Sequence, residues 1–284
     1  MKAALPDPSR ASLTSRVAVI DLLERHGLRA ERGFGQNFLV DDGALKAIVA
    51  AAELTGADSV FEVGPGLGVL TRELAARALT VVSVELDRRL APALAETLAG
   101  LGNVELLFAD AMAFDLGVLP PGCVLVANLP YNVATALITK ALASGRFGRL
   151  VFLVQKEVAQ RLAAKASEPA YGALSLLTAH FGRVRLVREV KPGSFLPAPK
   201  VTSSVVRIDV DPQAAPDDEL FELIHQGFAH RRKTLKRNLI YAGYPEAAAE
   251  AALAELGLDQ RVRAEALSLA EFKRLRMALA VGLG

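Results

Sequence analysis

The chain has 284 residues, with 33 Lys and Arg, 31 Asp and Glu, one Cys and no Trp. One cysteine excludes a disulfide framework and a cysteine-rich zinc site. No uninterrupted apolar run approaches the ~20 residues of a membrane span, and the N-terminus lacks the apolar segment of a secretory signal. These features predict a globular, cytoplasmic protein.

Charge is unevenly distributed along the chain. Residues 41–139 carry 5 Lys and Arg against 12 Asp and Glu, whereas residues 140–200 carry 11 against 3. Residues 212–284 carry ten of each, but HRRKTLKRN at 230–238 has five cations and no acid. The pattern indicates one part that binds a cation and another that binds a polyanion.

The first part of the chain alternates between strand and helix patterns, after an amphipathic helix over 12–26 and a loop over 33–42. The predicted strands cover 60–63, 80–86, 104–109, 123–129 and 149–155. The predicted helices cover 44–54, 70–78, 88–99 and 134–143. This alternation indicates an α/β fold, with a parallel sheet covered by helices on both faces.

Two later β-rich segments, 183–190 and 201–210, have no predicted helix between them and are expected to pair antiparallel at the end of the sheet. After linker-like residues 209–218, only helical patterns occur, over 218–229, 231–242, 246–256 and 269–280. We therefore predict an α/β domain over 1–210, with an N-terminal helical extension at about 1–32, and a small all-α domain over 211–284.

The predicted strand 60–63 leads directly into the glycine-rich turn 64–68. Glycines admit positive φ and let the backbone approach a ligand, and the next helix offers its N-terminal N–H groups. The turn departs from the dinucleotide fingerprint, because Val69 stands where the third small residue belongs, and no P-loop lysine follows. Glu62, just before the turn, would also repel a pyrophosphate.

Acidic residues end the next two predicted strands. Glu85, 21 residues after Gly64, can accept both hydroxyls of a ribose, and Asp110 can accept from an adenine amino group. Together they suit a ligand that contains adenosine and carries a net positive charge. S-Adenosylmethionine, a sulfonium, fits better than NAD or ATP.

The tetrapeptide Asn128-Leu129-Pro130-Tyr131 follows the fourth strand, in the arrangement of methyltransferases that act on amino nitrogens of planar substrates. The Asn128 side-chain oxygen and the Leu129 carbonyl can accept the two hydrogens of an adenine N6 and favour a pyramidal nitrogen. Pro130 fixes φ and so holds that carbonyl, while Tyr131 offers a face on which an extruded base can stack. This chemistry needs no metal, and we predict no metal site.

Six motifs occur in one order along the chain: FGQNFLVD (34–41), FEVGPGLGVLT (61–71), VELD (84–87), the strand end at Asp110, NLPYNV (128–133) and SFLPAPKVTSSVV (194–206). With them the chain resembles the ribosomal-RNA adenine dimethyltransferases, most closely the small-subunit kasugamycin-sensitivity methyltransferase family. The resemblance implies a Rossmann-like class I methyltransferase sheet. It also implies S-adenosylmethionine-dependent dimethylation of N6 of two adjacent adenines in the 3′-terminal hairpin of 16S rRNA.

The resemblance also assigns roles to individual residues. The residues expected to bind the cofactor are Gln36, Asn37, Leu39, Gly64, Gly66, Glu85, Asp110 and Asn128. The residues expected to hold the target adenine are Asn128, Leu129, Pro130, Tyr131 and Phe195. For Phe195, the neighbouring prolines Pro197 and Pro199 indicate an exposed, stiff loop that could present the ring to a base.

The helical domain is then expected to bind rRNA in the small ribosomal subunit. Its candidates, with one from the catalytic domain, are Arg231, Arg232, Lys233, Lys236, Arg237 and Lys200. As a helix, the basic segment would present cations at i, i+4 spacing to phosphates. The basic stretch before it would extend the track through Lys140, Arg146, Arg149, Arg161, Arg183, Arg185 and Arg188. We expect a monomer with no membrane partner.

Three alternatives stay open at this point. A large-subunit rRNA methyltransferase of the macrolide-resistance type shares the catalytic half, but the segment RRKTLKRNL favours the small-subunit member. A non-catalytic nucleic-acid-binding relative, such as the mitochondrial transcription factor built on this fold, is disfavoured by the intact NLPY motif and the Glu85–Asp110 pair. A DNA adenine methyltransferase normally carries a target-recognition domain, for which the C-terminal stretch is short.

Overall fold

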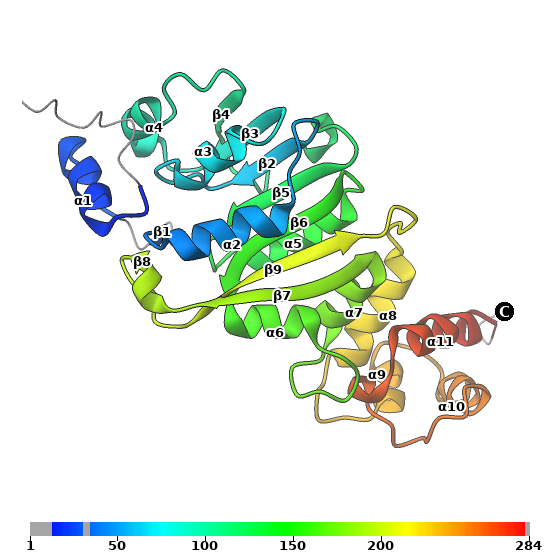
Figure 1. The fold of residues 1–284 in the computed structure, drawn as a ribbon. Coiled ribbons are helices and arrows are strands. Elements are labelled where there is room, and N and C mark those ends of the chain that lie inside the picture. Colours follow the sequence, from blue (N-terminus) through cyan, green and yellow to red (C-terminus); the bar gives the residue numbers. More distant parts are fainter. Residues whose placement is uncertain (1–12, 31–34, 282–284) are drawn as a thin grey trace, which may run out of the picture. The chain divides into compact units, whose positions relative to one another are not determined.

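The computed structural model describes residues 13–30 and 35–281 (Figure 1). The chain divides into two compact units, one formed by residues 1–159 with 185–212 and the other by residues 160–184 with 213–284. The predicted domain boundary, which placed 160–184 in the first domain, was wrong for these residues. These residues join the helical unit because Tyr171 packs in its core and donates its hydroxyl to the Leu267 carbonyl at 2.7 Å.

Seven strands form one sheet in the order β4–β3–β2–β5–β6–β9–β7. The five strands from β4 to β6 run parallel, and β9 runs antiparallel to β6. Their bounds are β2 (Ser59–Val63), β3 (Thr80–Glu85), β4 (Val104–Phe108), β5 (Cys123–Asn128), β6 (Phe147–Gln155), β7 (Gly182–Val190) and β9 (Ser203–Val210). The predicted parallel sheet is confirmed, and the two late β-rich segments are neighbours at its end.

The register brings the ends of four strands to one edge of the sheet. Val63, the last residue of β2, lies beside Val84 of β3 and Ala127 of β5. Glu85 lies beside Phe108 of β4. Because β2 pairs with β3 on one side and with β5 on the other, its end is the point where the strand order reverses. Ligands of open α/β sheets bind at this position.

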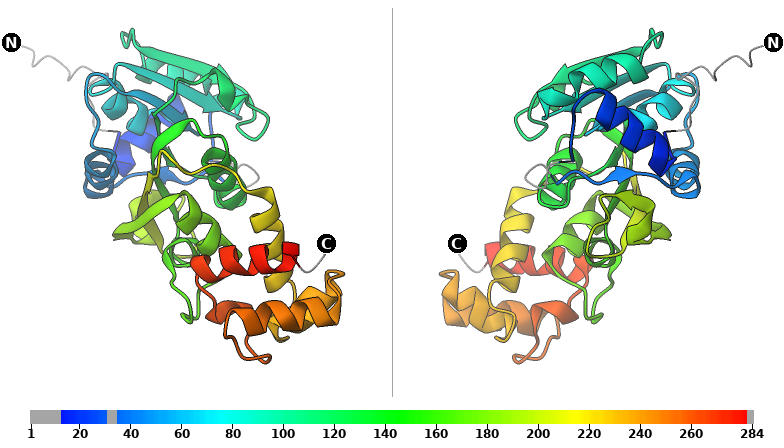
Figure 2. Two further views of the ribbon diagram at one scale, coloured as in Figure 1. Left: turned by 90° about the vertical axis from the view of Figure 1, so that its right-hand side faces the viewer. Right: turned by 90° about the vertical axis from the view of Figure 1, so that its left-hand side faces the viewer.

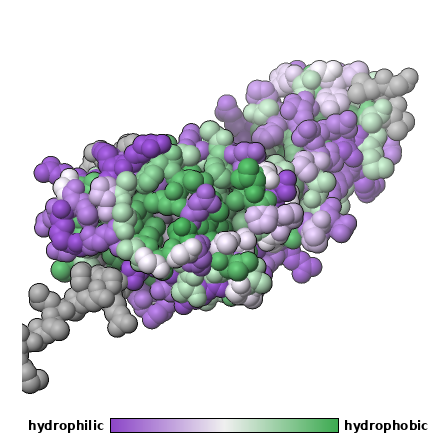
Figure 3. Space-filling view, turned by 90° about the horizontal axis from the view of Figure 1, so that it is seen from above, coloured by the Kyte–Doolittle hydropathy of each residue, from purple (hydrophilic) through white to green (hydrophobic). Residues whose placement is uncertain are grey.

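Helices cover the sheet through alternate apolar residues of its buried strands. Val60, Val81 and Val124 pack with Ile48 of α2 (Asp42–Ala52) and Leu74 of α3 (Val69–Ala75) in one core cluster. In Figure 1, α2 lies in front of the sheet and α5 (Ala134–Ala143) behind it. The strands of this unit are flanked by helices in both side views (Figure 2). Seen from above, its surface shows one broad apolar area with hydrophilic side chains around it (Figure 3).

The N-terminal helix α1 (Arg16–Arg25) packs Val19 and Leu22 against Leu67 of the glycine turn and Leu94 of α4 (Ala91–Thr97). The predicted start of this helix at residue 12 lies outside the described residues, as do positions 33 and 34 of the predicted loop. The rest of that loop contains the short strand β1 (Phe38–Leu39), which pairs antiparallel with β8 (Phe195–Leu196).

The second unit is helical and has its own apolar core. Its helices are α7 (Ala173–Phe181), α8 (Asp218–Phe228), α9 (Leu235–Tyr241), α10 (Glu246–Glu255) and α11 (Leu269–Val281), and α6 (Lys156–Ala163) leads into it. Helices α6 and α7 were not predicted from the sequence. No helix among the described residues is long and apolar enough to cross a membrane.

The prediction of one helix over 231–242 was wrong at its start. The helix begins at Leu235, and the side chain of its N-cap Thr234 accepts from the Arg237 N–H. Arg231, Arg232 and Lys233 therefore lie in the turn before α9, and they do not share a helical face with Lys236.

Candidate active site

A cavity of about 240 Å³ opens at the edge where the strands end. It is lined by the residues that follow β2, β3, β4 and β5, by the loop around Gln36 and by the first turns of α5. The structure thus brings together the predicted residues Gln36, Asn37, Leu39, Gly64, Gly66, Glu85, Asp110, Asn128, Leu129, Pro130 and Tyr131. The charged members of its described lining are Glu85 and Asp110, with no Lys, Arg or His.

The glycine turn has the backbone that the sequence predicts. Gly64 has φ +70° and Gly66 has φ +60°, in the left-handed region that L side chains rarely adopt. A Cβ at Gly66 would also stand 3.3 Å from the ring of Phe38. Larger residues are therefore disfavoured by conformation at Gly64, and by both conformation and space at Gly66.

Glu85 is deeply set, with 7% of its surface exposed. One carboxylate oxygen accepts the Gly66 N–H at 3.2 Å, and the other accepts the Asp87 N–H at 2.9 Å. Burial raises the pKa of this carboxyl, and the two backbone donors act in the opposite direction. The backbone fixes the orientation of the carboxylate, and each oxygen keeps acceptor capacity for ligand hydroxyls.

Two exposed apolar side chains flank the acidic groups. Leu86, directly after Glu85, is 56% exposed, and Met112, two residues after Asp110, is 37% exposed, although both line the cavity. Such side chains suit the faces of a flat aromatic ring. Neither residue was predicted from the sequence, although an apolar residue directly after the acidic strand end at Glu85 was a usable signal for Leu86.

Glu62 lies behind the glycine turn and outside the cavity. It is almost fully buried on β2, where the Ser83 hydroxyl of the adjacent β3 donates to its carboxylate. Burial raises its pKa to about 7, against an ordinary value of 4.5. The structure therefore gives Glu62 a place between strands, where it joins β2 to β3.

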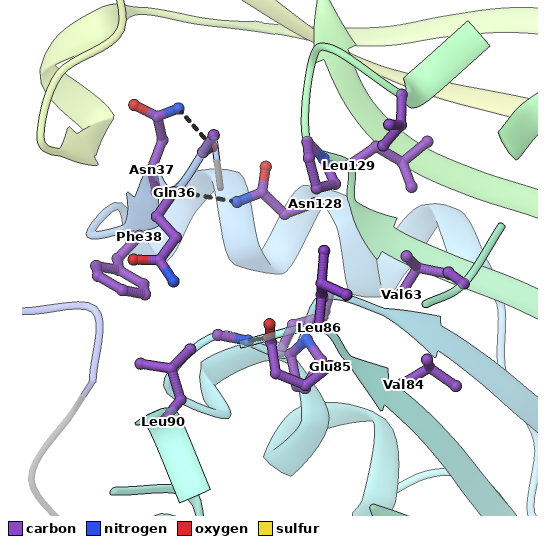
Figure 4. A pocket seen from close by; sticks show the side chains of 18 of the residues that line it. Gln36, Asn37, Phe38, Val63, Val84, Glu85, Leu86, Leu90, Asn128 and Leu129 are labelled. Carbon is purple, nitrogen blue, oxygen red and sulfur yellow. Dashed lines mark hydrogen bonds between the residues drawn. The ribbon is translucent and has the colours of Figure 1, made fainter. Parts of the chain in front are cut away.

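The NLPY segment is tied to the loop on the opposite wall (Figure 4). The Asn128 side-chain nitrogen donates to the Asn37 carbonyl at 3.0 Å, which leaves its oxygen as the acceptor that the amide presents elsewhere. The Gln36 side chain donates to Asp87 at 2.8 Å, beside Glu85. The same loop thus contacts two sides of the cavity. One is the acidic wall, which contains Glu85 and Asp110, and the other is the NLPY wall, formed by residues 128–131.

Tyr131 is half-buried, and its hydroxyl shares a hydrogen bond with the Ser203 hydroxyl of β9. Burial raises the pKa of this phenol. Because Ser203 holds the hydroxyl end, the Tyr131 ring has a fixed position in the lining of the cavity.

The expected exposure of Phe195 was wrong. Its side chain is 0% exposed, and it lies in the same core cluster as Leu39 and Ile48. Pairing of β8 with β1 turns the ring inward, and Arg16 donates to the carbonyl of Phe195 at 3.2 Å. In this structure Phe195 cannot stack on a base, whereas Lys200 of the same loop is exposed.

The basic residues divide into an exposed group and a group committed to partners within the fold. Arg231, Arg232, Lys233 and Arg237 are exposed, with the Arg237 guanidinium over the Tyr241 ring, whereas Lys236 pairs with Glu250 at 2.8 Å. Four members of the expected phosphate track are committed within the fold: Lys140 to backbone carbonyls, Arg149 to the Ala52 carbonyl at the end of α2, Arg185 to Asp209 and Arg188 to the Gly43 carbonyl. The structure therefore contradicts a continuous track through the first unit.

Comparison with known proteins decides the family. The family model for ribosomal RNA adenine dimethylase matches residues 27–280. The chain belongs to this family. Among its relatives, this dimethylase-family chain is 45% identical over 282 residues to the ribosomal RNA small subunit methyltransferase A of Deinococcus radiodurans, covering 98% of this chain and 96% of that protein. It is 42% identical to the protein of the same name from Magnetococcus marinus, covering 89% and 93%.

Solved structures of similar proteins agree with the dimethylase family. A dimethyladenosine transferase from Plasmodium falciparum matches with a TM-score of 0.73 and 28% identity, covering 84% of this chain and 95% of that one. The 23S rRNA methyltransferase ErmE matches with a TM-score of 0.68 and 28% identity, covering 86% and 100%. The dimethylase chain therefore has the Rossmann-like methyltransferase fold, with a helical C-terminal region.

The buried Glu62 makes stability depend on pH. Because its pKa is raised in the folded state, its contribution to stability is complete below pH 4.5 and is lost as the pH rises through about 7. We expect the free energy of unfolding to fall, relative to Glu62→Gln, by roughly 3 kcal/mol over this range. Urea unfolding at several pH values measures it. Glu105→Gln, at an exposed position of β4, is the control, and parallel pH curves for Glu62→Gln and the unmodified chain would contradict the assignment.

The burial of Phe195 predicts a structural loss on truncation. Phe195→Ala should lower the free energy of unfolding by about 3–5 kcal/mol, because it removes a fully buried ring from the core. Val201→Ala, in the exposed part of the same loop, should change it by less than about 0.5 kcal/mol. Thermal and urea unfolding compare the two variants. Equally small decreases in the free energy of unfolding for the two variants would contradict the burial of Phe195.

Proposed function

We propose that this protein transfers methyl groups from S-adenosylmethionine to N6 of two adjacent adenines in the 3′-terminal hairpin of 16S rRNA. The observation that carries the proposal is the Asn128 amide, fixed by the Asn37 carbonyl at the end of the parallel sheet. Its side-chain oxygen is an acceptor beside a cavity whose other wall is acidic. Small-subunit rRNA is the substrate class in the names of the relatives at 42–45% identity.

The residues of the cavity fit S-adenosylmethionine. Its described lining offers two carboxylates and no cation, which favours a sulfonium ligand and disfavours a polyphosphate. Glu85 would hold the ribose hydroxyls, Asp110 the adenine amino group, and Leu86 and Met112 the faces of the adenine ring. Gln36, Asn37 and Leu39 would close over the methionine end, beside Gly64 and Gly66.

The bound cofactor would supply an electrophilic methyl group. The chain's part is then to prepare the nitrogen of the target. Asn128 Oδ1 and the Leu129 carbonyl would each accept one N6 hydrogen and so turn the nitrogen lone pair toward the methyl carbon. Transfer of the methyl group would leave the nitrogen positively charged, and this nitrogen would then release a proton to solvent. Tyr131, held through its hydroxyl, would stack on the adenine ring.

The helical unit would supply contacts to rRNA. Arg231, Arg232, Lys233 and Arg237 are exposed and carry four positive charges within seven residues, which suits phosphates. A ribosomal substrate would place the enzyme in the cytoplasm, where we expect it to act as a monomer. A large-subunit target is the second candidate, supported by the likeness to ErmE at 28% identity.

The test is transfer of radiolabelled methyl groups from S-adenosylmethionine to under-methylated small ribosomal subunits. Large subunits, naked 16S rRNA and DNA run in parallel. Label confined to small subunits, at two methyls on each of two adenines, is the expected result. Label in large subunits would identify large-subunit rRNA as the substrate instead. Binding of the cofactor without any label would favour a non-catalytic nucleic-acid-binding protein.

Removal of Glu85 should act on cofactor affinity. Glu85→Ala deletes the acceptors for the ribose and should weaken S-adenosylmethionine by about 10- to 100-fold, so that the ligand-dependent rise in melting temperature shrinks. Calorimetric titration and thermal scans measure both effects, with Glu105→Gln as the control. An unchanged affinity of Glu85→Ala for S-adenosylmethionine would show that Glu85 does not bind the cofactor.

Removal of Asn128 should act mainly on the chemical step. Asn128→Ala should lower the rate of methyl transfer by at least about 100-fold, because its oxygen contacts the reacting nitrogen, with less than about a 3-fold change in cofactor affinity. Single-turnover transfer and calorimetric titration give the two quantities. Asn128→Asp keeps an oxygen acceptor but loses the donor to Asn37, which separates the two contacts of the amide. Equal losses in rate and affinity for Asn128→Ala would contradict the role.

A further inference from the structure

The Lys140 ammonium meets three backbone carbonyls of the segment that follows β4. Its Nζ lies 3.2 Å from the Ala111 oxygen, 2.7 Å from the Met112 oxygen and 2.6 Å from the Phe114 oxygen. An ammonium has three N–H donors, so these three bonds use all of them. The sequence placed Lys140 in a phosphate track, but in the structure no donor is left for a phosphate.

The carbonyls converge because the segment is a tight turn around Asp110. The Asp110 carbonyl accepts the N–H groups of Ala113 and Phe114, and one Asp110 carboxylate oxygen accepts the Met112 N–H at 2.8 Å. The N–H groups are thus satisfied inside the turn, while its carbonyl dipoles point at one place outside it. A cation at that place satisfies three acceptors, two of them in partly buried contacts.

Lys140 also joins two walls of the cavity. It stands on α5, which begins at Ala134, three residues after the end of the NLPY segment, and Leu137 of this helix lines the cavity. The segment that it holds contributes Asp110, Ala111 and Met112 to the same cavity. One side chain therefore sets the position of the segment that contains Asp110 and Met112 against the helix that follows the NLPY segment.

We propose that Lys140 is a positioning residue for the adenine end of the cofactor. This inference rests on the proposed use of S-adenosylmethionine. Lys140 does not touch the ligand; it places Asp110 and Met112, the acceptor for the adenine amino group and one apolar face for the ring. Its loss loosens that wall and leaves Glu85, on the strand beside it, in place.

The test is a double-mutant cycle on full-length protein, read by calorimetric titration with S-adenosylhomocysteine. Lys140→Met should weaken binding by about 5- to 10-fold, and Asp110→Ala by about 10-fold. If Lys140 acts through Asp110, the second substitution should cost no more than about 3-fold once the first is present. Multiplicative losses would show a general structural effect and overturn the proposal.

Controls keep the outcomes distinct. Lys46→Met removes an exposed lysine that pairs with Asp42 on α2, and should leave binding of S-adenosylhomocysteine unchanged. If Lys140→Met does not fold, Lys140→Arg keeps the charge on a planar group, which cannot reach all three carbonyls from one atom, and should weaken binding by about 3-fold. If Lys140→Met loses affinity for rRNA but binds S-adenosylhomocysteine as the unmodified chain does, the proposal is overturned. Lys140 would then contact phosphates of the rRNA. If the unmodified chain binds no S-adenosylhomocysteine, the proposed function fails instead.

Discussion

The site depends on the alignment of parallel strands whose carboxyl ends meet at one edge of the sheet. β2 pairs with β3 and β5, so Val63 has Val84 on one side and Ala127 on the other. A slip of one residue in either pairing would turn buried side chains to the opposite face, and apolar helices on both faces make that costly. The position of Glu85 relative to the glycine turn and of Asn128 relative to both is therefore a consequence of core packing.

A second layer of polar contacts turns this alignment into a defined site. The loop around Gln36 bonds to Asp87 on the acidic wall and to Asn128 on the NLPY wall. The Lys140 ammonium donates to the backbone carbonyls of the segment that contributes Asp110 and Met112 to the cavity. Each contact joins segments distant in sequence, so the walls keep their spacing without a ligand. A site preorganised in this way loses less free energy on ordering when it binds.

The sequence was informative where a role depends on local pattern and uninformative where it depends on distant partners. The glycine turn, the acidic strand ends and the NLPY segment each follow an apolar strand directly, so their meeting at one sheet edge was predictable. Phe195 was not, because prolines predicted an exposed loop, whereas its burial comes from pairing with Leu39, far away in the chain. Lys140 was misassigned for the same reason, since composition records its charge but not the three carbonyls that surround it.

The bond between Asn128 and the Asn37 carbonyl has a consequence for the second methyl transfer. An unmodified adenine N6 offers two hydrogens to two acceptors, but after one methylation it offers a single hydrogen. Under the proposed function, the Asn128 amide cannot rotate to present its nitrogen without giving up the Asn37 carbonyl, so its oxygen would face the target as an acceptor in both rounds. The monomethyl nitrogen would therefore keep its remaining hydrogen on one acceptor and place its methyl group at the other. Room for that methyl group, rather than a second set of polar contacts, is what dimethylation requires of this pocket.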